Sequence, residues 1–346
     1  MSQNDIEMPP RDTRFQRVRA VAAARGRERT VVGFLLIPGF SLMSYACAAE
    51  PFRAANRLSG EELYRWIHFT PNGKPVAASN GVAIVPDAKM SDRVKLDMLF
   101  VCAGGDPSQF RDRATFDWLR RLASRDIGLG GVSGGPFVLA RAGLLAGYRC
   151  TIHWEHLDAF IEAFPRVDIR RTLYEIDRGR LTCSGGTAAL DMMHALIKAQ
   201  KGILLANAVS EWYLQTTIRS GDGPQRMALG QRLGIRSERV LATISAMERN
   251  LEEPLSRRTL AKAAAVSVRQ LERLFRGHVG QTVGDYYRDL RLQRSRSLIH
   301  ETTMPVLEVA VASGFISASH FSRAYKSRFG HSPRIDRARS LRSATA

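Results

Sequence analysis

The stretch from residue 259 to residue 325 contains one helical pattern twice, and this duplication limits the possible folds more than any other feature. Each copy has a short helical segment, an alanine-containing turn, a serine and a second helix with a polar, basic face. Ser267 and Ser317 precede the second helices, where a serine hydroxyl can accept a hydrogen bond from a first-turn amide. Apolar side chains recur at positions i, i+3 and i+4 in both second helices, at Leu271, Leu274, Phe275, Phe321, Ala324 and Tyr325. The pattern predicts two helix-turn-helix units, which can enter successive major grooves of DNA.

The region from 238 to 334 resembles the DNA-binding domain of the AraC/XylS transcription regulators. The stretches that carry this resemblance are Leu271-Glu272-Arg273-Leu274-Phe275, residues 287–292, Gly314-Phe315, residues 319–323 and Phe329-Gly330-His331-Ser332-Pro333. The resemblance implies an all-α domain that binds double-stranded DNA with sequence specificity. It also implies RNA polymerase as a partner and activation as the usual response.

Six side chains are candidates for reading bases. Matching the family pattern turns Arg269, Gln270, Arg273, Ser319, His320 and Arg323 toward the groove. Arginine can donate to guanine O6 and N7 together, and glutamine can pair with adenine, so these residue types suit base edges.

The net charge agrees with a nucleic-acid partner. The chain carries a formal charge of +18, and from residue 236 onward 20 lysines and arginines face 10 acidic residues. Excess positive charge raises affinity for phosphate backbones without establishing sequence reading. We interpret residues 1–30 as a disordered basic leader and residues 335–346 as a basic tail.

Cysteine spacing and hydropathy indicate a cytoplasmic protein without a metal centre or a membrane span. The four cysteines form no CxxC pair and have no metal-ligand spacing. No apolar run reaches the length of about 18 residues that crossing a bilayer needs. No cofactor is expected.

The chain upstream of residue 219 has a different texture. Apolar runs at 31–37, 98–102 and 127–132 end in glycine-rich turns, and helical patterns lie between them. Such alternation predicts a doubly wound, mostly parallel sheet, whose ligands bind at the carboxyl ends of the strands. We expect an α/β domain at 31–218 and a linker at 219–237, because glycines and a proline interrupt the pattern there.

The turn Gly131-Val132-Ser133-Gly134-Gly135 fits the G-x-S-x-G nucleophile elbow. Residues 31–200 resemble the DJ-1/PfpI, or class I glutamine amidotransferase-like, domain. The matching features are Gly104-Gly105, the elbow with residues 137–145, Thr151-Ile152-His153-Trp154 and residues 182–187. Catalytic relatives of that fold have a cysteine at the elbow, where this chain has Ser133. A serine hydroxyl needs an activating base, so we predict no catalytic residues. An amidase-like or hydrolytic enzyme fused to a DNA-binding module is the alternative.

In this order the two domains resemble the GlxA-like subgroup of AraC-family regulators, in which the first domain is a sensor. The closest texture is that of regulators of choline and glycine betaine catabolism, carried by residues 49–60 and 63–66, His153-Trp154-Glu155 and residues 184–187. The resemblance implies a small effector, either a quaternary ammonium or an amino-acid-like compound. Glycine betaine, carnitine and arginine all stay open. A homodimer is expected, and a first domain that only dimerises and binds no ligand is a further hypothesis.

The chemistry of a zwitterionic effector suggests where it would bind. Aromatic faces hold a quaternary ammonium, each by about 0.5–2 kcal/mol, and backbone amides at a helix start suit a carboxylate. Trp154 can be an aromatic wall or can simply pack under a loop. The predicted ligand-binding set is Phe40, Tyr45, Gly104, Gly105, Ser133, Gly134, His153 and Trp154.

Overall fold

The computed structural model describes residues 29–91 and 93–343, so nearly all of the predicted leader lies outside the described residues. The chain forms two compact units. The first ends at Trp154 and resumes over Arg166–Gln225, and the second combines Glu155–Pro165 with the chain from Arg226 onward. The change of unit after Gln225 lies inside the stretch that the sequence suggested as a linker. The excursion at 155–165 was not anticipated.

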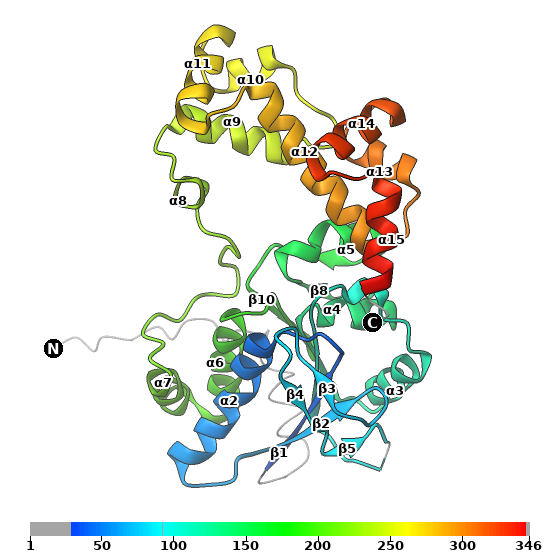
Figure 1. Cartoon of the computed structure of the whole chain (residues 1–346). Coiled ribbons are helices and arrows are strands. Elements are labelled where there is room, and N and C mark those ends of the chain that lie inside the picture. Colours follow the sequence, from blue (N-terminus) through cyan, green and yellow to red (C-terminus); the bar gives the residue numbers. More distant parts are fainter. Residues whose placement is uncertain (1–28, 92, 344–346) are drawn as a thin grey trace, which may run out of the picture. The chain divides into compact units, whose positions relative to one another are not determined.

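A seven-stranded sheet forms the centre of the first unit (Figure 1). Its order is β10-β11-β7-β6-β1-β2-β5, and every neighbouring pair is parallel except β10 with β11. The bounds are β1 Thr30–Leu36, β2 Tyr64–Thr70, β5 Ala88–Lys89, β6 Met98–Ala103, β7 Gly128–Ser133, β10 Tyr174–Asp177 and β11 Arg180–Cys183. Two small sheets pair β3 (Val76–Ala77) with β4 (Ala83–Ile84) and β8 (Arg149–Cys150) with β9 (Asp168–Ile169). The doubly wound, mostly parallel fold is confirmed.

Helices cover both faces of this sheet (Figure 1). Helices α2 (Leu42–Ser59), α6 (Ala188–Lys201) and α7 (Ile203–Trp212) pack together on one face, while α3 (Arg113–Ala123) and α4 (Gly135–Arg141) lie on the other. The short turns η2 (Pro107–Gln109) and η3 (Trp154–His156) follow β6 and β8. Strand residues such as Phe34 and Phe100 pack with α2 and α6 in one apolar core. Burial on both faces explains why the strands have continuous apolar sequences.

Gly135 lets α4 begin directly against the sheet. A Cβ atom at this position would lie 1.9 Å from the carbonyl oxygen of Val101, far inside van der Waals contact. Any other residue would push the helix away from β6. The close approach fixes the sharp turn from β7 into α4, which carries Ser133.

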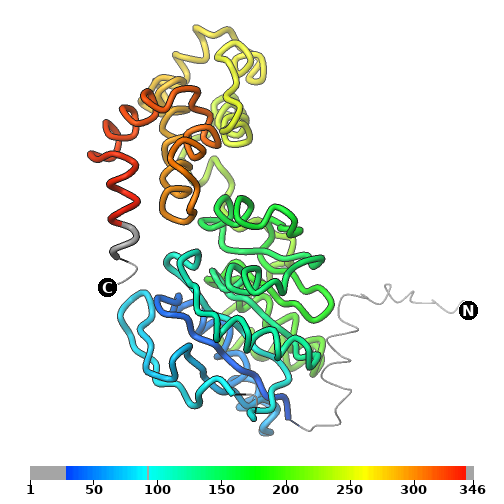
Figure 2. The backbone as a smooth tube through the Cα atoms, turned by 90° about the vertical axis from the view of Figure 1, so that its right-hand side faces the viewer, coloured from blue at the N-terminus to red at the C-terminus, as the bar shows by residue number. Residues whose placement is uncertain are grey.

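The second unit is helical. Its helices are α5 (Leu157–Ala163), α8 (Leu229–Leu233), α9 (Glu238–Arg249), α10 (Arg257–Ala263), α11 (Val268–Val279), α12 (Val283–Glu301), α13 (Val306–Ala312), α14 (Ala318–Phe329) and α15 (Pro333–Ser343). Val283 and Tyr287 of α12 belong to a core shared with α9, α10 and α11, whereas Leu292 and Leu298 belong to one shared with α13 and α14. Figure 2 shows this helix in orange, between the yellow and the red helices. One helix therefore joins the two predicted helix-turn-helix units.

Candidate functional site

Helix α11 presents the first set of predicted base-reading residues. Ser267 caps it, because its hydroxyl accepts a hydrogen bond from the Gln270 amide at 3.2 Å. Leu271 and Phe275 are fully buried in the first core. Their burial turns the opposite face outward, and Arg269, Gln270 and Arg273 are all exposed.

Gln270 also has a structural role that the sequence analysis missed. Its side-chain oxygen accepts a hydrogen bond from the Ser267 amide at 3.0 Å, which completes a capping box. In bidentate pairing with adenine, the side-chain NH₂ group of a glutamine donates a hydrogen bond while its side-chain oxygen accepts one. Reading adenine would therefore compete with the cap, and Gln270 can keep both only by donating from its NH₂ group.

Helix α14 presents the second set. Ser317 caps it, accepting a hydrogen bond from the His320 amide at 3.4 Å, and Phe321 and Tyr325 are fully buried. The predicted residues Ser319, His320 and Arg323 are exposed. His320 and Arg323 line a cleft of about 380 Å³ between α12 and α14, together with Arg288, Asp289, Leu292, Ala324, Ser327 and Arg328.

Two cations beside the first recognition helix were not singled out from the sequence. Arg258 and Lys262 line a groove together with Ser267 and Gln270. Both belong to α10, the helix that crosses the DNA backbone in a helix-turn-helix. Their spacing of four residues, on the exposed face of a helix that begins at Arg257, was the available signal.

A buried carboxylate, Asp336, holds α14 and α15 against α12. This carboxylate and the side chains that contact it form a polar hub. Asp336 accepts hydrogen bonds from the Tyr325 hydroxyl at 2.6 Å and from Arg296 Nε at 3.2 Å. Its other oxygen lies 3.1 Å from His300 Nε2 and 3.0 Å from His331 Nε2. Burial alone would raise the pKa of Asp336, but hydrogen bonds from Tyr325, His331 and His300 lower it to about 2. Residue 336 thus takes part in the packing of the helical unit, although the sequence suggested a tail from 335 onward.

The elbow of the first unit lies where strand β7 ends. Ser133 has a φ of 59°, the left-handed conformation that a nucleophile elbow needs, and its exposed fraction is 7%. A Cβ atom on Gly185 would lie 2.6 Å from Ser133 Cβ and 2.8 Å from Ser44 Oγ. Gly104 lies close to the Gly39 carbonyl and the Ser41 amide. The carboxyl ends of β1, β6, β7 and β11 therefore meet around Ser133.

Amides at this elbow already donate to protein acceptors. The Gly134 amide donates to the Ala103 carbonyl at 3.0 Å, and the Gly186 amide donates to Ser44 Oγ at 2.7 Å. Stabilising an oxyanion requires amides that point at the substrate. Behind the turn, burial raises the pKa of the Cys183 thiol to about 12, which keeps this cysteine protonated.

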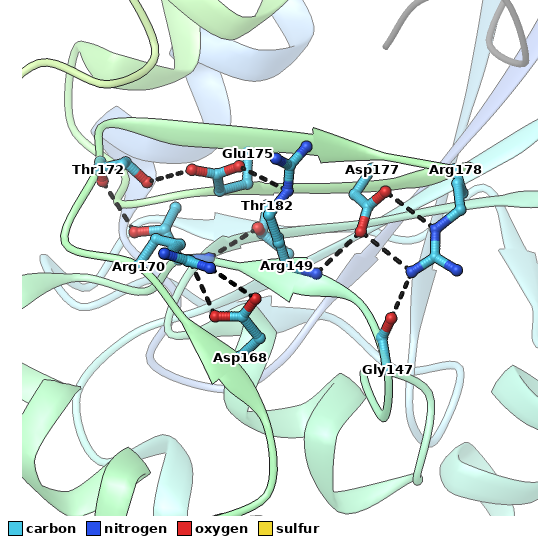
Figure 3. Close-up of polar contacts among 10 residues, drawn as sticks. Gly147, Arg149, Asp168, Arg170, Thr172, Glu175, Asp177, Arg178 and Thr182 are labelled. Atoms are coloured by element: carbon cyan, nitrogen blue, oxygen red, sulfur yellow. Dashed lines mark hydrogen bonds and ion pairs between the residues drawn. The ribbon is translucent and has the colours of Figure 1, made fainter. Parts of the chain in front are cut away.

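A polar network holds the chain at β8, which leads to His153, against β10 and β11 (Figure 3). The Arg149 amide donates to Asp177 at 2.9 Å, and the Thr151 amide donates to Thr182 Oγ1 at 3.0 Å. Burial alone would raise the pKa of Asp177, but hydrogen bonds from Arg178 and the Arg149 amide lower it. The network therefore fixes the backbone of residues 149–151, which leads to His153 beside the elbow.

His153 is joined to the elbow through the backbone. Its amide donates to the Ser133 carbonyl at 3.3 Å, and its ring lies 5.3 Å from that of Trp154. Trp154 is 44% exposed. The structure therefore brings His153 and Ser133 together, with an exposed aromatic face beside them.

Phe40, just before helix α2, and Tyr45, in its first turn, form a different environment. Phe40 is fully buried and packs edge-on against Tyr45 at 5.7 Å between ring centroids. The Tyr45 hydroxyl lies 2.6 Å from His68 Nε2, and His68 Nδ1 lies 2.6 Å from Asp87 Oδ2. The carboxylate selects the histidine tautomer in which Nδ1 donates, so Tyr45 donates to Nε2. Burial raises the pKa of Tyr45. This tyrosine–histidine–aspartate chain was not predicted.

Among residues 29–91 and 93–343, none of the helices combines the length and the apolar character that a bilayer crossing would require.

Two families match separate parts of the chain. The DJ-1/PfpI family matches residues 32–199, and the helix-turn-helix domain matches residues 260–339. These ranges contain the sheet with its elbow and the two recognition helices.

Relatives match both parts together. The HTH-type transcriptional regulator GlxA of Rhizobium meliloti is 43% identical over 92% of this chain and 99% of its own length. The HTH-type transcriptional regulators CdhR and GbdR of Pseudomonas aeruginosa are 44% and 43% identical, over 88% and 90% of this chain and 90% and 85% of theirs. The chain therefore belongs to this family of AraC-type transcriptional regulators, which join a DJ-1/PfpI domain to a helix-turn-helix DNA-binding domain.

Proposed function

We propose that this regulator is an activator whose DJ-1/PfpI unit binds a small zwitterionic or cationic metabolite, such as glycine betaine, without converting it. The observation that carries the proposal is the surroundings of Ser133. The side chain is 7% exposed, and the amides of Gly134 and Gly186 already have protein acceptors. This arrangement suits a turn that shapes a pocket better than it suits a nucleophile with an oxyanion hole.

The proposed effector site lies around the elbow. Ser133, Gly134, Gly104 and Gly105 would form its floor, with His153 and Trp154 at its mouth. The exposed indole of Trp154 supports a contact with a quaternary ammonium. Phe40 and Tyr45 belong to the predicted ligand-binding set as further aromatic walls. Because Phe40 is fully buried, it would support Tyr45 from behind.

Calorimetry with the full chain tests the effector. Glycine betaine, dimethylglycine, carnitine, choline and arginine are titrated separately, and saturable binding by one or more of them is expected. A chain that binds none of them while still binding DNA would favour the alternative in which the first unit only dimerises.

Trp154→Ala should weaken effector binding by about 2- to 30-fold, because one aromatic wall contributes about 0.5–2 kcal/mol to a bound ammonium. DNA binding without effector should be unchanged. Trp212→Ala is the matched control, since Trp212 is exposed to a similar degree, at 48%, but lies at the end of α7. Equal losses in both variants would remove Trp154 from the site.

Ser133→Ala separates a sensor from an enzyme. We expect no product from the wild type with any of the five compounds, and a milder loss of affinity in Ser133→Ala than in Trp154→Ala. Consumption of a compound by the wild type that stops in Ser133→Ala would instead support the hydrolytic alternative.

The proposal also includes a homodimer in the cytoplasm and contact with RNA polymerase at the promoter. Leu204 in the first turn of α7 and Leu214, two residues after its end, are 84% and 87% exposed, which supports a protein contact there. Light scattering of the full chain measures the oligomeric state.

A further inference from the structure

The two helix-turn-helix units meet at a seam centred on Arg291, in the middle of α12. Its guanidinium carbon lies 4.4 Å from the centre of the Phe315 ring and 5.9 Å from that of Tyr287. Arg291 Nη1 also donates to the Gly314 carbonyl at 3.3 Å. Tyr287 belongs to the core of the first helix-turn-helix and Phe315 to the core of the second. The Arg291 side chain therefore touches both helix-turn-helix units.

The backbone at Gly314 also lies close to the first helix-turn-helix. Gly314 has a φ of +75°, and a Cβ atom there would lie 2.5 Å from the Leu251 carbonyl oxygen and 2.9 Å from that of Glu252. The turn before α14, in the second helix-turn-helix, therefore packs directly on the loop between α9 and α10 of the first helix-turn-helix. Only glycine fits this position.

Tyr287 holds that loop in place. Its hydroxyl donates to the Asn250 carbonyl and accepts a hydrogen bond from the Leu255 amide at 3.2 Å. The ring that contacts Arg291 is thus fixed to both ends of the loop on which Gly314 rests. Arg291, Tyr287 and Gly314 close a ring of contacts across the seam.

The contact of Arg291 with the rings is partly shielded from water. Burial lowers the pKa of its guanidinium, because a partly desolvated cation is less favourable than a hydrated one. A cation over an aromatic face interacts more strongly when it is desolvated. Without this contact, α12 and the packing of Gly314 on the α9–α10 loop would be left to hold the two helix-turn-helix units in register, and long helices bend.

We propose that Arg291 is a positioning residue that fixes α11 and α14 relative to each other and so sets the permitted spacing of the two half-sites. Helices reading successive grooves must match one DNA turn of about 10–10.5 base pairs. One inserted base pair rotates the second half-site by roughly 35° about the DNA axis. A rigid seam cannot follow that rotation, whereas a loosened one can. The inference rests on DNA reading by both recognition helices.

The test uses the full chain and an operator selected by the wild type from random DNA. Its two half-sites are assigned by the base preferences that Arg273→Ala and Arg323→Ala lose. Affinity is then measured on this operator, on a version with one base pair inserted between the half-sites, and on each half-site alone. Arg249→Ala is the control, because it removes an exposed arginine of α9 that donates to Ser245.

The wild type and Arg249→Ala should bind the inserted operator at least about tenfold more weakly than the original, because the second contact is no longer intramolecular at high effective concentration. Arg291→Ala should bind the original operator about tenfold more weakly and lose less than about threefold on insertion. Binding to isolated half-sites should be unchanged. Arg291→Lys keeps a cation near the rings and should restore most of the spacing discrimination.

Phe315→Leu removes the ring face while keeping an apolar side chain, and it provides a second route if Arg291→Ala does not fold. It should show the same tolerance of the inserted base pair. A folded Arg291→Ala or Phe315→Leu protein that discriminates as sharply as the wild type overturns the proposal. Failure of the wild type to select any operator would instead contradict DNA reading itself, which is a separate outcome.

Discussion

Replacing Asp336 by alanine should destabilise the helical unit by about 3–5 kcal/mol, because removing one partner of a buried ion pair leaves the other partners uncompensated. Arg296, His300, His331 and the Tyr325 hydroxyl all face this carboxylate, from α12, α14 and the turn before α15. The loss of stability should also weaken DNA binding, since Tyr325 is part of the buried face of the second recognition helix.

The positions of the tryptophans make this measurement specific. All four, Trp66, Trp118, Trp154 and Trp212, belong to the first unit, so urea unfolding followed by tryptophan fluorescence reports that unit alone. Circular dichroism at the helix band reports both units. In Asp336→Ala the dichroism transition should move to lower urea while the fluorescence midpoint stays constant.

Asp289→Ala is the control, because Asp289 pairs with Arg328 at 3.6 Å in a partly exposed ion pair of the same unit. Such pairs contribute about 0–1 kcal/mol. Shifts of equal size in Asp289→Ala and Asp336→Ala would contradict the buried hub.

The hub also predicts a dependence on pH. The pKa of Asp336 in the folded protein is about 2, below the value of about 3.9 in an unfolded chain. A lowered folded-state pKa means that the stabilisation is complete above the unfolded pKa and is lost as the pH falls through the folded one. The stability difference between the wild type and Asp336→Ala should therefore shrink as the pH falls from about 4 to about 2.

Arg273→Ala and Arg323→Ala should each relax specificity at a separate half-site. A bidentate contact to guanine contributes about 1–3 kcal/mol of discrimination, which corresponds to roughly 5- to 150-fold. Losing a phosphate contact weakens all sequences alike and reduces the salt slope by about one. Competition binding against single-base variants of the selected operator, at two salt concentrations, distinguishes the two roles.

Arg276→Ala is the matched control, since Arg276 is an exposed arginine in the last turn of α11. It should lower affinity uniformly or leave it unchanged. Uniform losses in Arg273→Ala and Arg323→Ala as well would make both arginines backbone contacts.

Local features of the fold followed from the sequence. Apolar runs that end in glycine predicted β1, β6 and β7, and the serines before α11 and α14 are indeed N-caps. These predictions depend on periodicity and on neighbouring residues, which a sequence displays directly. The exposure of the six candidate DNA-reading side chains followed in the same way, from the burial of the opposite helix face.

Contacts between distant residues could not be predicted in this way. The chain Tyr45–His68–Asp87, the seam at Arg291 and the hub at Asp336 join residues from different elements, and no local pattern marks such pairs. The grouping of 155–165 with the helical unit has the same origin. Full burial of Phe40 depends on how α2 lies over the sheet, which the residues beside Phe40 do not specify.

The second helices of the two helix-turn-helix units, α11 and α14, have different sequences, and the turn before α14 has one more residue, Ile316, than the turn before α11. If both helices contact bases, their difference should give the protein–DNA complex a polarity. One DNA-binding unit should occupy its site in a single orientation, so inverting that site should reverse the direction in which the bound protein faces along the promoter. A symmetric reader cannot carry such directional information, whereas this tandem arrangement has it within one polypeptide.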